Sequence, residues 1–395
     1  MIIKKQNIKP NVPHLRFPEF TEEWVNVSLK DVADFQKERI SSGLLDESTY
    51  ISTENILQNF QGVQSAISIP ANTNVVAYKK NDILLSNIRP YLKKVWFSDR
   101  IGGCSADVFV LRSKTCEPEF LYNVIASDKF INYVMSGAKG VKMPRGDKNQ
   151  MESFSFSIPA VAEQRKISRL FQLLDEKITT QNKIIEKYES LIQAIIYKAK
   201  TDGISKGTWQ KIDLCKVLQE RNEKNIDGRT ICSVSVSQGV VNQIEYLGRS
   251  FAAKQTHHYN VVKYGDIVYT KSPTGDFPYG IIKRSDMIKD VAVSPLYGVY
   301  SPVNDSIGVI LHFYFMQPSN AFNYLHPLIQ KGAKNTINIT NGRFLENSVP
   351  LPISESEADT IAGILKSIQE KKGIEKSLLQ SYTKEKEYLL GQMFI

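Results

Sequence analysis

The sequence predicts an α+β fold with two β-rich mixed domains, separated by two long helices that pack as an antiparallel coiled coil. Three observations predict this fold: an internal repeat, short β-branched runs within each copy of the repeat, and a long helical pattern after each copy. A chain of 395 residues is long enough to bury two separate cores.

The internal repeat is visible at four places that occur in the same order in both halves. The matching positions are Trp24 with Trp209, Asp82 with Asp266, Gly137 with Gly332, and Pro159 with Pro352. One match alone is weak, but four in order indicate a tandem duplication. We therefore predict that a domain, a long helix, a second domain and a second long helix follow one another along the chain.

Each domain is expected to be dominated by strands, because β-branched and aromatic runs are bounded by turn residues. The runs are 75–78, 82–85 and 108–111 in the first copy, and 232–236, 267–269 and 298–300 in the second. Residues 120–136 are predicted as one amphipathic helix. Its counterpart, 313–330, is expected to be broken by Pro318 and Pro327.

The two long helices follow from apolar residues that recur every three, four and seven positions. We place them at 161–202 and 356–395, which leaves 1–160 and 203–355 as the domains. The expected core of the helix pair is Leu170, Leu174, Ile178, Ile185, Tyr188, Ile364, Ile368, Leu378 and Tyr382. The alternative is that each helix packs only against its own domain.

The charge and the cysteines suggest a partner and a compartment. The formal net charge of +9 suits an anionic partner. The four cysteines, Cys104, Cys116, Cys215 and Cys232, form no CxxC pair and have no histidine at metal-ligand spacing, so no metal site is expected. Without a signal peptide or an 18-residue apolar run, a cytoplasmic location is expected.

No motif of a known catalytic type is found in the sequence. It lacks a phosphate-binding loop, an amino-methyltransferase signature and the common hydrolase motifs. Asp175-Glu176-Lys177 falls in a long helix, where consecutive side chains cannot converge on one metal. Asp82 and Asp266 are expected to cap turns, and His257-His258 to lie at the surface or on DNA.

The candidate DNA-contact segments combine cations, which bind phosphates, with polar side chains suited to base edges. They are 86–94 and 139–150 in the first copy, 270–279 and 331–343 in the second, and the polar stretch 49–55. The candidate DNA-binding residues are Arg89, Tyr91, Lys93, Lys94, Lys139, Lys142, Arg145, Lys148, Asn149, Lys271, Thr274, Lys334, Asn335, Asn338, Asn341 and Arg343. Equivalent loops with different residues indicate one scaffold that reads two unlike half-sites about one helical turn apart, roughly 10 bp.

The chain resembles the specificity subunits of type I restriction–modification systems over nearly its whole length. The resemblance is carried by Val12-Pro-His-Leu-Arg-Phe-Pro with Trp24, by Asn81-Asp-Ile-Leu-Leu-Ser, and by Ile158-Pro159 followed by Glu163-Gln-Arg-Lys-Ile. The second copy is weaker: after Leu351-Pro-Ile, the string Glu357-Ala-Asp-Thr-Ile lacks the Gln and Lys.

This resemblance implies two target-recognition domains, 1–160 and 203–355, with the long helices as spacers. It implies a bipartite double-stranded DNA target with a fixed gap, two docked methyltransferase subunits, and restriction subunits in a larger assembly that defends against foreign DNA. S-adenosylmethionine, ATP and magnesium would belong to those partners, and this chain would have no catalytic residue. The alternatives are a coiled-coil DNA-binding or protein-scaffold subunit of another methyltransferase system, and an undetected nuclease.

Overall fold

The computed structural model describes residues 11–140, 142–331 and 337–395, with the backbone alone for residues 331, 337 and 338. The chain divides into two compact units. Unit 1 is Met1–Gln181 with Leu378–Ile395, and unit 2 is Asn182–Ser377. Each unit therefore contains part of both long helices, α5 (Val161–Lys206) and α10 (Glu355–Met393). The four-segment division of the chain into recognition domains and spacers stays a prediction.

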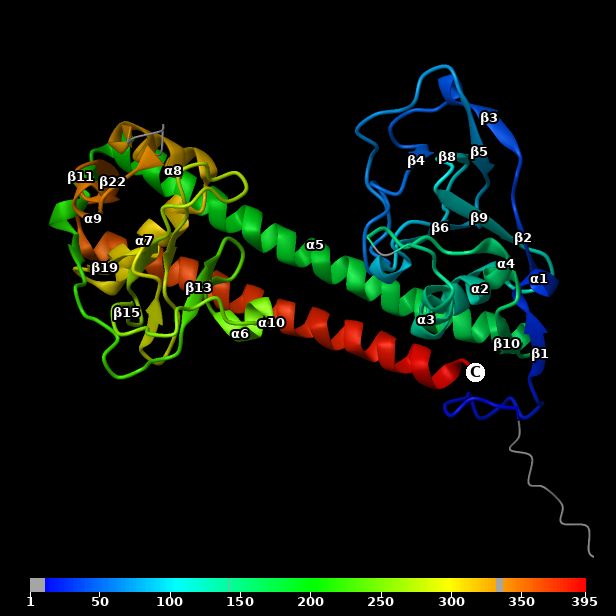
Figure 1. Ribbon diagram of the computed structural model, residues 1–395. Helices are drawn as coiled ribbons and strands as arrows, with labels where there is room; N and C mark the ends of the chain where they lie inside the picture. The colour runs from blue at the N-terminus through cyan, green and yellow to red at the C-terminus, as the bar shows by residue number, and fades with distance from the viewer. Residues whose placement is uncertain (1–10, 141, 332–336) are drawn as a thin grey trace, which may run out of the picture. The chain divides into compact units, whose positions relative to one another are not determined.

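Unit 1 contains two four-stranded sheets and one strand pair (Figure 1). The first sheet is antiparallel, in the order β2 (Ala33–Phe35), β9 (Val108–Ser113), β6 (Ile83–Ser86) and β7 (Val95–Phe97). The second has the order β3 (Arg39–Ser41), β5 (Asn74–Tyr78), β8 (Gly102–Cys104) and β4 (Tyr50–Ile51), and its β4–β8 pair is parallel. The pair is β1 (Val25–Ser28) with β10 (Ser155–Ile158).

Unit 2 repeats the first sheet of unit 1, and this confirms that the duplication extends to the fold. Its four-stranded antiparallel sheet has the order β12 (Leu218–Glu220), β19 (Gly298–Pro302), β16 (Ile267–Tyr269) and β17 (Ile282–Arg284). The pair β11 (Trp209–Asp213) with β22 (Ser348–Pro352) matches β1 with β10. Further pairs are β13 (Cys232–Ser235) with β14 (Gly239–Asn242), β15 (Asn260–Val262) with β18 (Val291–Val293), and β20 (Gln330–Lys331) with β21 (Ile337–Asn338).

The single helix predicted over residues 120–136 is wrong. The structure has two helices there, α2 (Pro118–Ile125) and α3 (Asp128–Ser136). The break falls at Ser127, whose hydroxyl accepts a hydrogen bond from the backbone N–H of Phe130 and so begins a new helix. Both helices pack between the first sheet and α5 (Figure 1).

The counterpart in unit 2 begins earlier than predicted. Helix α7 (Asp305–Phe315) is capped by Asn304, and α8 (Pro318–Leu325) starts at the first of the two prolines. A 3₁₀ turn, His326–Leu328, follows around Pro327. A proline is favoured in the first turn of a helix, where its missing N–H has no partner to lose. The two prolines therefore mark boundaries, as expected. The remaining short helices are α1 (Leu29–Val32), α4 (Lys148–Glu152), α6 (Gln243–Leu247) and α9 (Asn341–Phe344).

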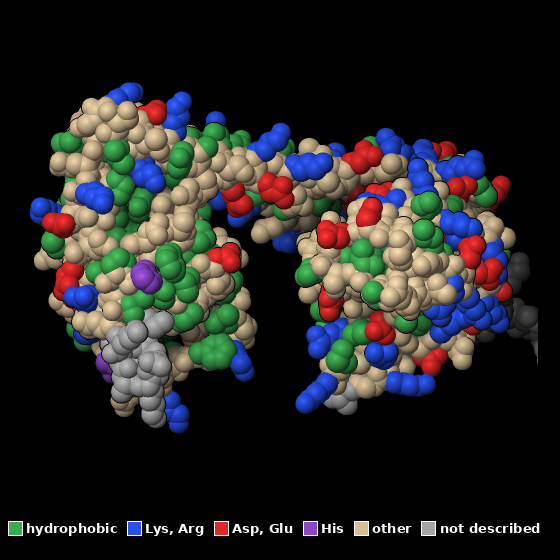
Figure 2. Space-filling model, turned by 90° about the horizontal axis from the view of Figure 1, so that it is seen from above, with side chains coloured by type: hydrophobic (Ala, Val, Ile, Leu, Met, Phe, Trp, Pro, Cys, Tyr) green, Lys and Arg blue, Asp and Glu red, His purple; other side chains and the backbone are tan. Residues whose placement is uncertain are grey.

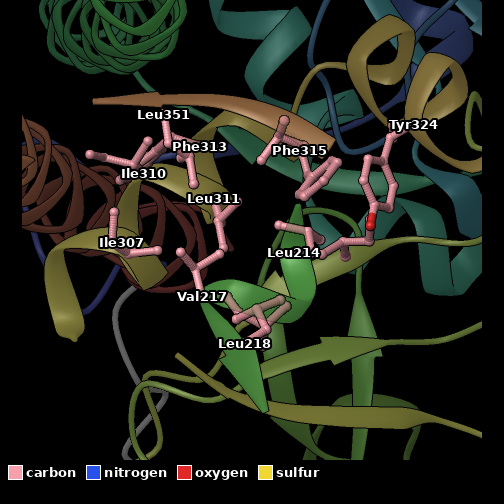
Figure 3. Packing of buried hydrophobic residues seen from close by; sticks show 14 of the residues in the cluster. Leu214, Val217, Leu218, Ile307, Ile310, Leu311, Phe313, Phe315, Tyr324 and Leu351 are labelled. Carbon is pink, nitrogen blue, oxygen red and sulfur yellow. The ribbon is translucent and has the colours of Figure 1, made fainter. Parts of the chain in front are cut away.

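The long helices supply buried side chains to the core of each unit. In unit 2, Ile192 and Ile196 of α5 and Leu365 of α10 join a cluster built from α7, β11 and β22. Figure 3 shows part of this cluster, in which Ile310, Phe313 and Leu351 pack together. In unit 1, α10 supplies Leu390 and Met393 to the cluster around Phe120 and Phe171.

Within each unit, α5 and α10 contact each other in an antiparallel sense. In unit 1, Lys386 forms an ion pair with Asp175, and the Lys177 ammonium lies over the Tyr382 ring. In unit 2, the Lys372 Nζ lies 3.6 Å from the Glu189 Oε1. Residue numbers rise along α5 as they fall along α10, so the helices run in opposite directions. The α+β fold with two long helices is confirmed.

The expected core of the helix pair needs one correction. Leu174 and Ile185 are buried, Ile368 and Leu170 are partly buried, and Ile178, Tyr188 and Tyr382 are of intermediate exposure. Ile364 and Leu378 are 46% and 38% exposed and do not belong to this core. The buried face of α10 instead follows Ile361, Leu365 and Lys372, positions that lie on one side of a helix.

A buried ion pair ties the N-terminal segment to α5 in unit 1. The Arg16 guanidinium donates from Nε to Glu163 Oε1 and from Nη2 to Glu163 Oε2, each at 2.7 Å. Glu163 is 1% exposed and Arg16 is 13% exposed. The Glu163 carboxylate raises the pKa of Arg16 through this hydrogen bond. A carboxylate this deeply buried requires its cation.

A buried basic cluster lies at the end of β17 in unit 2. Lys283, Arg284 and Lys372 are each no more than 5% exposed, and His312 of α7 lies beside them. The His312 Nδ1 accepts a hydrogen bond of 3.0 Å from the backbone N–H of Arg284. Burial, together with the nearby charges of Lys283, Arg284 and Lys372, lowers the pKa of His312 to about 3. The imidazole is therefore neutral in the folded unit.

Replacing Arg16 with Met should lower the free energy of unfolding of unit 1 by roughly 3 to 5 kcal/mol, because Glu163 would remain buried without a cation. The measurement is equilibrium urea unfolding. The control is the double variant Arg16→Met, Glu163→Gln, which removes the charge and should recover most of the loss. Equal losses in the single and double variants would contradict the prediction.

The stability of unit 2 should fall in acid because of His312. The unfolded histidine has a pKa near 6.5, so its contribution is complete above that pH and is lost as the pH falls toward 3. Between pH 7 and pH 4, the parent should lose roughly 3 kcal/mol more than His312→Asn. Urea unfolding followed at Trp209, the tryptophan of unit 2, measures this. Parallel pH profiles would rule the contribution out.

Candidate nucleic-acid interface

The two basic segments predicted in unit 1 lie side by side. Ile88 bridges Arg145, the backbone N–H of Arg89 donates to Pro144 O at 2.8 Å, and that of Gly146 donates to Asn87 O at 3.1 Å. One segment starts at the last residue of strand β6, and the other runs into α4, which Asp147 caps. Backbone hydrogen bonds thus join two loops that are far apart in the sequence.

Two exposed cations of this region are unpaired within the described part of the chain, and an aromatic ring beside them is open to solvent. Arg89 and Lys142 are exposed, and neither has an ion pair among the residues that the structure describes. Tyr91 is 48% exposed. Arg89 has a φ of 51°, in the left-handed region that non-glycine residues rarely adopt. Exposed, unpaired cations of this kind are suited to phosphate groups.

Four further cations of the region are paired with carboxylates at its edge. The pairs are Lys93 with Asp128, Lys139 with Asp147, Arg145 with Asp107, and Lys148 with Glu152. The Lys148 ammonium also lies over the Phe35 ring. Since these pairs are partly exposed, each is weak in water and can open for a stronger anion. Asn149 is exposed at the start of α4.

The polar stretch 49–55 supports these loops. The Lys94 ammonium donates to the carbonyl of Thr53, which ties the stretch to the first basic segment. Asn55 is 3% exposed, and its amide donates to the carbonyls of Tyr50 and Gln64. Burial of Asn55 means that it fixes the loop from within. Among residues 49–55, Glu54 is the residue that is fully exposed to solvent.

In unit 2, the second predicted segment contacts Glu220, at the end of β12, through Asn341. The Asn341 amide donates to Glu220 at 2.6 Å. Burial lowers the pKa of Lys271, and the charge of Glu220 opposes that shift. Thr274 is exposed in a tight turn closed by Phe277. Arg343 forms an ion pair with Glu346.

Three candidates of unit 2 cannot be placed in this way. Lys334 and Asn335 lie outside the described residues, and the structure describes only the backbone of Asn338. The DNA-contact assignments in both units stay predictions.

The two matched aspartates anchor the sheets beneath these loops. Asp82 accepts the backbone N–H of Lys79 at 2.7 Å, and Asp266 accepts that of Lys263 at 2.8 Å. The turn-capping role is therefore confirmed. Sequence reasoning missed their arginine partners. Arg112 of β9 binds both oxygens of Asp82, and Arg221 binds both oxygens of Asp266.

Groups that could carry chemistry are scarce among the described residues. No three His, Cys, Asp or Glu side chains in that part of the chain come together as metal ligands. Burial raises the pKa of the thiols of Cys104 and Cys116 to about 12 and that of Cys232 to about 11, so they are poor nucleophiles. His257 and His258 are exposed. No described helix is apolar enough over a sufficient length to cross a membrane.

Charge is distributed over both units rather than gathered on one. In the view of Figure 2, Lys and Arg side chains are interspersed with Asp and Glu on each unit. The paired cations described above are one local reason for this mixture. Net positive charge thus comes from many separate groups, of which Arg89 and Lys142 have free side chains within the described part of unit 1.

Comparison with known proteins gives the class of this fold and loop arrangement. Residues 21–190 match the family model described as the type I restriction modification DNA specificity domain. These residues therefore carry a domain of that family. The fold of the chain is that of a solved type I restriction–modification S subunit from M. genitalium, at a TM-score of 0.63 and 14% identity, with 97% of this chain and 99% of that chain covered.

Two curated relatives bear the same family name. The type I restriction enzyme EcoDI specificity subunit of Escherichia coli is 24% identical over 190 residues, which are 46% of this chain and 42% of the relative. The MjaVIII specificity subunit of Methanocaldococcus jannaschii is 25% identical over 206 residues, 51% of this chain and 46% of the relative. The matched regions span less than half of these relatives. The resemblance to type I specificity subunits is confirmed.

Proposed function

We propose that the chain is the DNA-reading subunit of a type I restriction–modification complex and that each unit reads one half of a bipartite target. The observation that carries this proposal is the repeated scaffold. The sheets β2-β9-β6-β7 and β12-β19-β16-β17 have the same order, yet the loops beyond β6 and β16 differ in charge and length. One scaffold with two different sets of loops suits two unlike half-sites.

The loops of the two units differ in the chemistry that they offer to DNA. Unit 1 presents cations and a tyrosine at Arg89, Tyr91 and Lys142. Unit 2 presents Thr274, and its Asn341 is half-buried and held by Glu220, so this surface carries fewer charges. Cations bind phosphates and the guanine edge, whereas asparagine suits the adenine edge. The two half-sites are therefore expected to differ in sequence.

The remaining parts of the proposal concern the assembly. Two methyltransferase subunits dock on this chain, restriction subunits join them, and the complex acts in the cytoplasm. S-adenosylmethionine, ATP and magnesium belong to those partners, and the gap between the half-sites is fixed by the long helices. The methyltransferase takes the target base out of the stack, and this chain positions the methyltransferase at its target site on the DNA. The curated relatives, named as specificity subunits, support this division of labour.

Two alternative functions make different demands. A nuclease would need convergent carboxylates, and Asp175, the acidic residue singled out in the sequence, is paired with Lys386 in the helix pair. A protein scaffold without DNA binding would need no exposed cations on its loops, in contrast to Arg89 and Lys142. Neither alternative explains the match to a DNA specificity domain.

Reversing the charge of the two free cations should weaken DNA binding by the complex reconstituted with methyltransferase. A plot of the logarithm of the binding constant against the logarithm of the salt concentration has a slope of about −0.9 for each phosphate that a side chain neutralises. We expect Arg89→Glu and Lys142→Glu each to make this slope shallower by about 0.9, because each variant loses one such phosphate contact. Binding isotherms over a series of salt concentrations measure this slope.

The matched control is Lys80→Glu. Lys80 is exposed and belongs to the turn that enters β6, whereas Arg89 belongs to the loop that leaves it. The control makes the same charge change at the opposite end of one strand. If Lys80→Glu and Arg89→Glu weakened DNA binding equally, the effect would come from net charge alone. That result would refute the assignment of the loop after β6 to the DNA interface.

Methylation mapping tests the bipartite reading. Base-resolved mapping of methylated adenines should show a split motif with a fixed gap that disappears when this chain is deleted. Asn149→Ala should relax one half of the motif and Thr274→Ala the other, since each lost base contact changes discrimination by about 1 to 3 kcal/mol. A continuous motif, or one in which both halves change together, would refute one half-site per unit.

A further inference from the structure

The two copies of the repeat begin their long helices with a glutamate at the same place. Glu163 is the third residue of α5, and Glu357 is the third residue of α10. Helix α5 follows β10, which pairs with β1, and helix α10 follows β22, which pairs with β11. A buried tryptophan stands at the start of each partner strand: Trp24 directly precedes β1, and Trp209 begins β11. The two carboxylates are therefore equivalent positions of one scaffold.

In unit 1, the carboxylate is occupied by a guanidinium. Arg16 binds both oxygens of Glu163 at 2.7 Å. Arg16 lies on a segment that crosses the end of α10, where the backbone N–H of Leu15 donates to Gln392 O at 3.1 Å. With Glu163 used in this way, the indole N–H of Trp24 is buried without a partner among the described residues.

In unit 2, the equivalent carboxylate has no such cover. Glu357 accepts the indole N–H of Trp209 at 2.9 Å, and no guanidinium within the described residues pairs with it. The chain passes from α5 into β11 through Gly207 and Thr208, and the Thr208 hydroxyl donates to Glu357 at 3.3 Å. Among the described residues, no arginine-bearing segment like 11–20 lies against this glutamate. An open pocket of about 480 Å³ lies there instead.

The walls of this pocket suit an arginine with apolar neighbours. Glu357 and Asp202 supply two carboxylates, against one cation, Lys206. Ala199 and Ile361 supply an apolar wall. In unit 1, the arginine that fills the equivalent place stands between Leu15 and Phe17. A carboxylate binds a guanidinium through two parallel hydrogen bonds, a geometry that an ammonium cannot reproduce.

We propose that this pocket of unit 2 binds an arginine side chain of a partner protein, presented on a segment with the chemistry of residues 12–18. The occupant is another protein rather than a second copy of this chain. In each copy, Arg16 already neutralises Glu163, which is 1% exposed, and its withdrawal would leave that carboxylate buried and unpaired. The proposal does not rest on DNA reading.

The test uses a ten-residue peptide, Asn-Val-Pro-His-Leu-Arg-Phe-Pro-Glu-Phe, which copies residues 11–20. The full chain carries three tryptophans, so its three indole N–H signals can be followed by ¹⁵N NMR. The Trp209 signal should shift and saturate at low-millimolar peptide. The Trp24 and Trp96 signals should stay in place, because both belong to unit 1.

Two controls isolate the guanidinium. A peptide with citrulline in place of the arginine keeps the shape and loses the charge, and it should bind at least tenfold more weakly. Glu357→Gln should weaken the arginine peptide to the same degree, while its amide oxygen still accepts the Trp209 indole N–H. A urea-unfolding midpoint of that variant equal to the parent's shows that unit 2 is folded.

Three outcomes would overturn the proposal. One is a Trp209 signal that does not move up to about 10 mM peptide, a concentration that detects even very weak binding. Another is an equal response to the arginine and citrulline peptides. The third is a dimer of this chain, detected by light scattering and abolished by Glu357→Gln, which would assign the pocket to a second copy. DNA binding by the reconstituted complex is measured separately, so its failure would leave these outcomes unchanged.

Discussion

The antiparallel contact between α5 and α10 is the constraint on which both units depend. Neither helix is confined to one unit: residues up to Gln181 of α5 join unit 1, and residues from Leu378 of α10 return to it. Phe394 packs on Phe120 and Phe171, so the last residues of the chain complete a core built mostly from the first 181. The ion pairs of Lys386 and Lys372 with acids of α5 help to set which residues face each other. Polar pairs within a helix seam specify register more than they add stability.

Much of this fold could be predicted from the sequence, since repeats and apolar periodicity are local signals. The duplication, most strands and both long helices were visible in this way. The break at Ser127 was not, because a cap hydrogen bond can interrupt an apolar pattern without changing its period. The exposure of Ile364 and Leu378 was also missed. Both positions fit the heptad spacing, but only the packed unit decides which side of so wide a stripe is covered.

The candidate interface was predicted less completely, because its contacts join residues far apart in the chain. The two basic segments of unit 1 could be named from composition, and their contact through Ile88 and Arg145 could not. The carboxylate Asp107, which engages Arg145, carries no signal of its own in the sequence. The matched aspartates show the same limit. Arg112 comes from β9, whereas Arg221 directly follows β12, so a comparison of the two copies could find the acids and not their partners. The scaffold retained the buried carboxylate and satisfied it from a different neighbour.

The discontinuous make-up of unit 1 has a consequence for the order of synthesis on the ribosome. Unit 2, Asn182–Ser377, is one continuous stretch and has all its residues before Leu378 is added. Unit 1 is translated first but lacks Leu390, Met393 and Phe394 until the segment after Ser377 has been added, so its cluster around Phe171 stays partly uncovered during that time. Domains usually fold from the N-terminus onward as the chain emerges. Here the nascent chain must finish its second half before its first half can close, and a ribosome that stalls in α10 would leave an apolar surface for chaperones to cover.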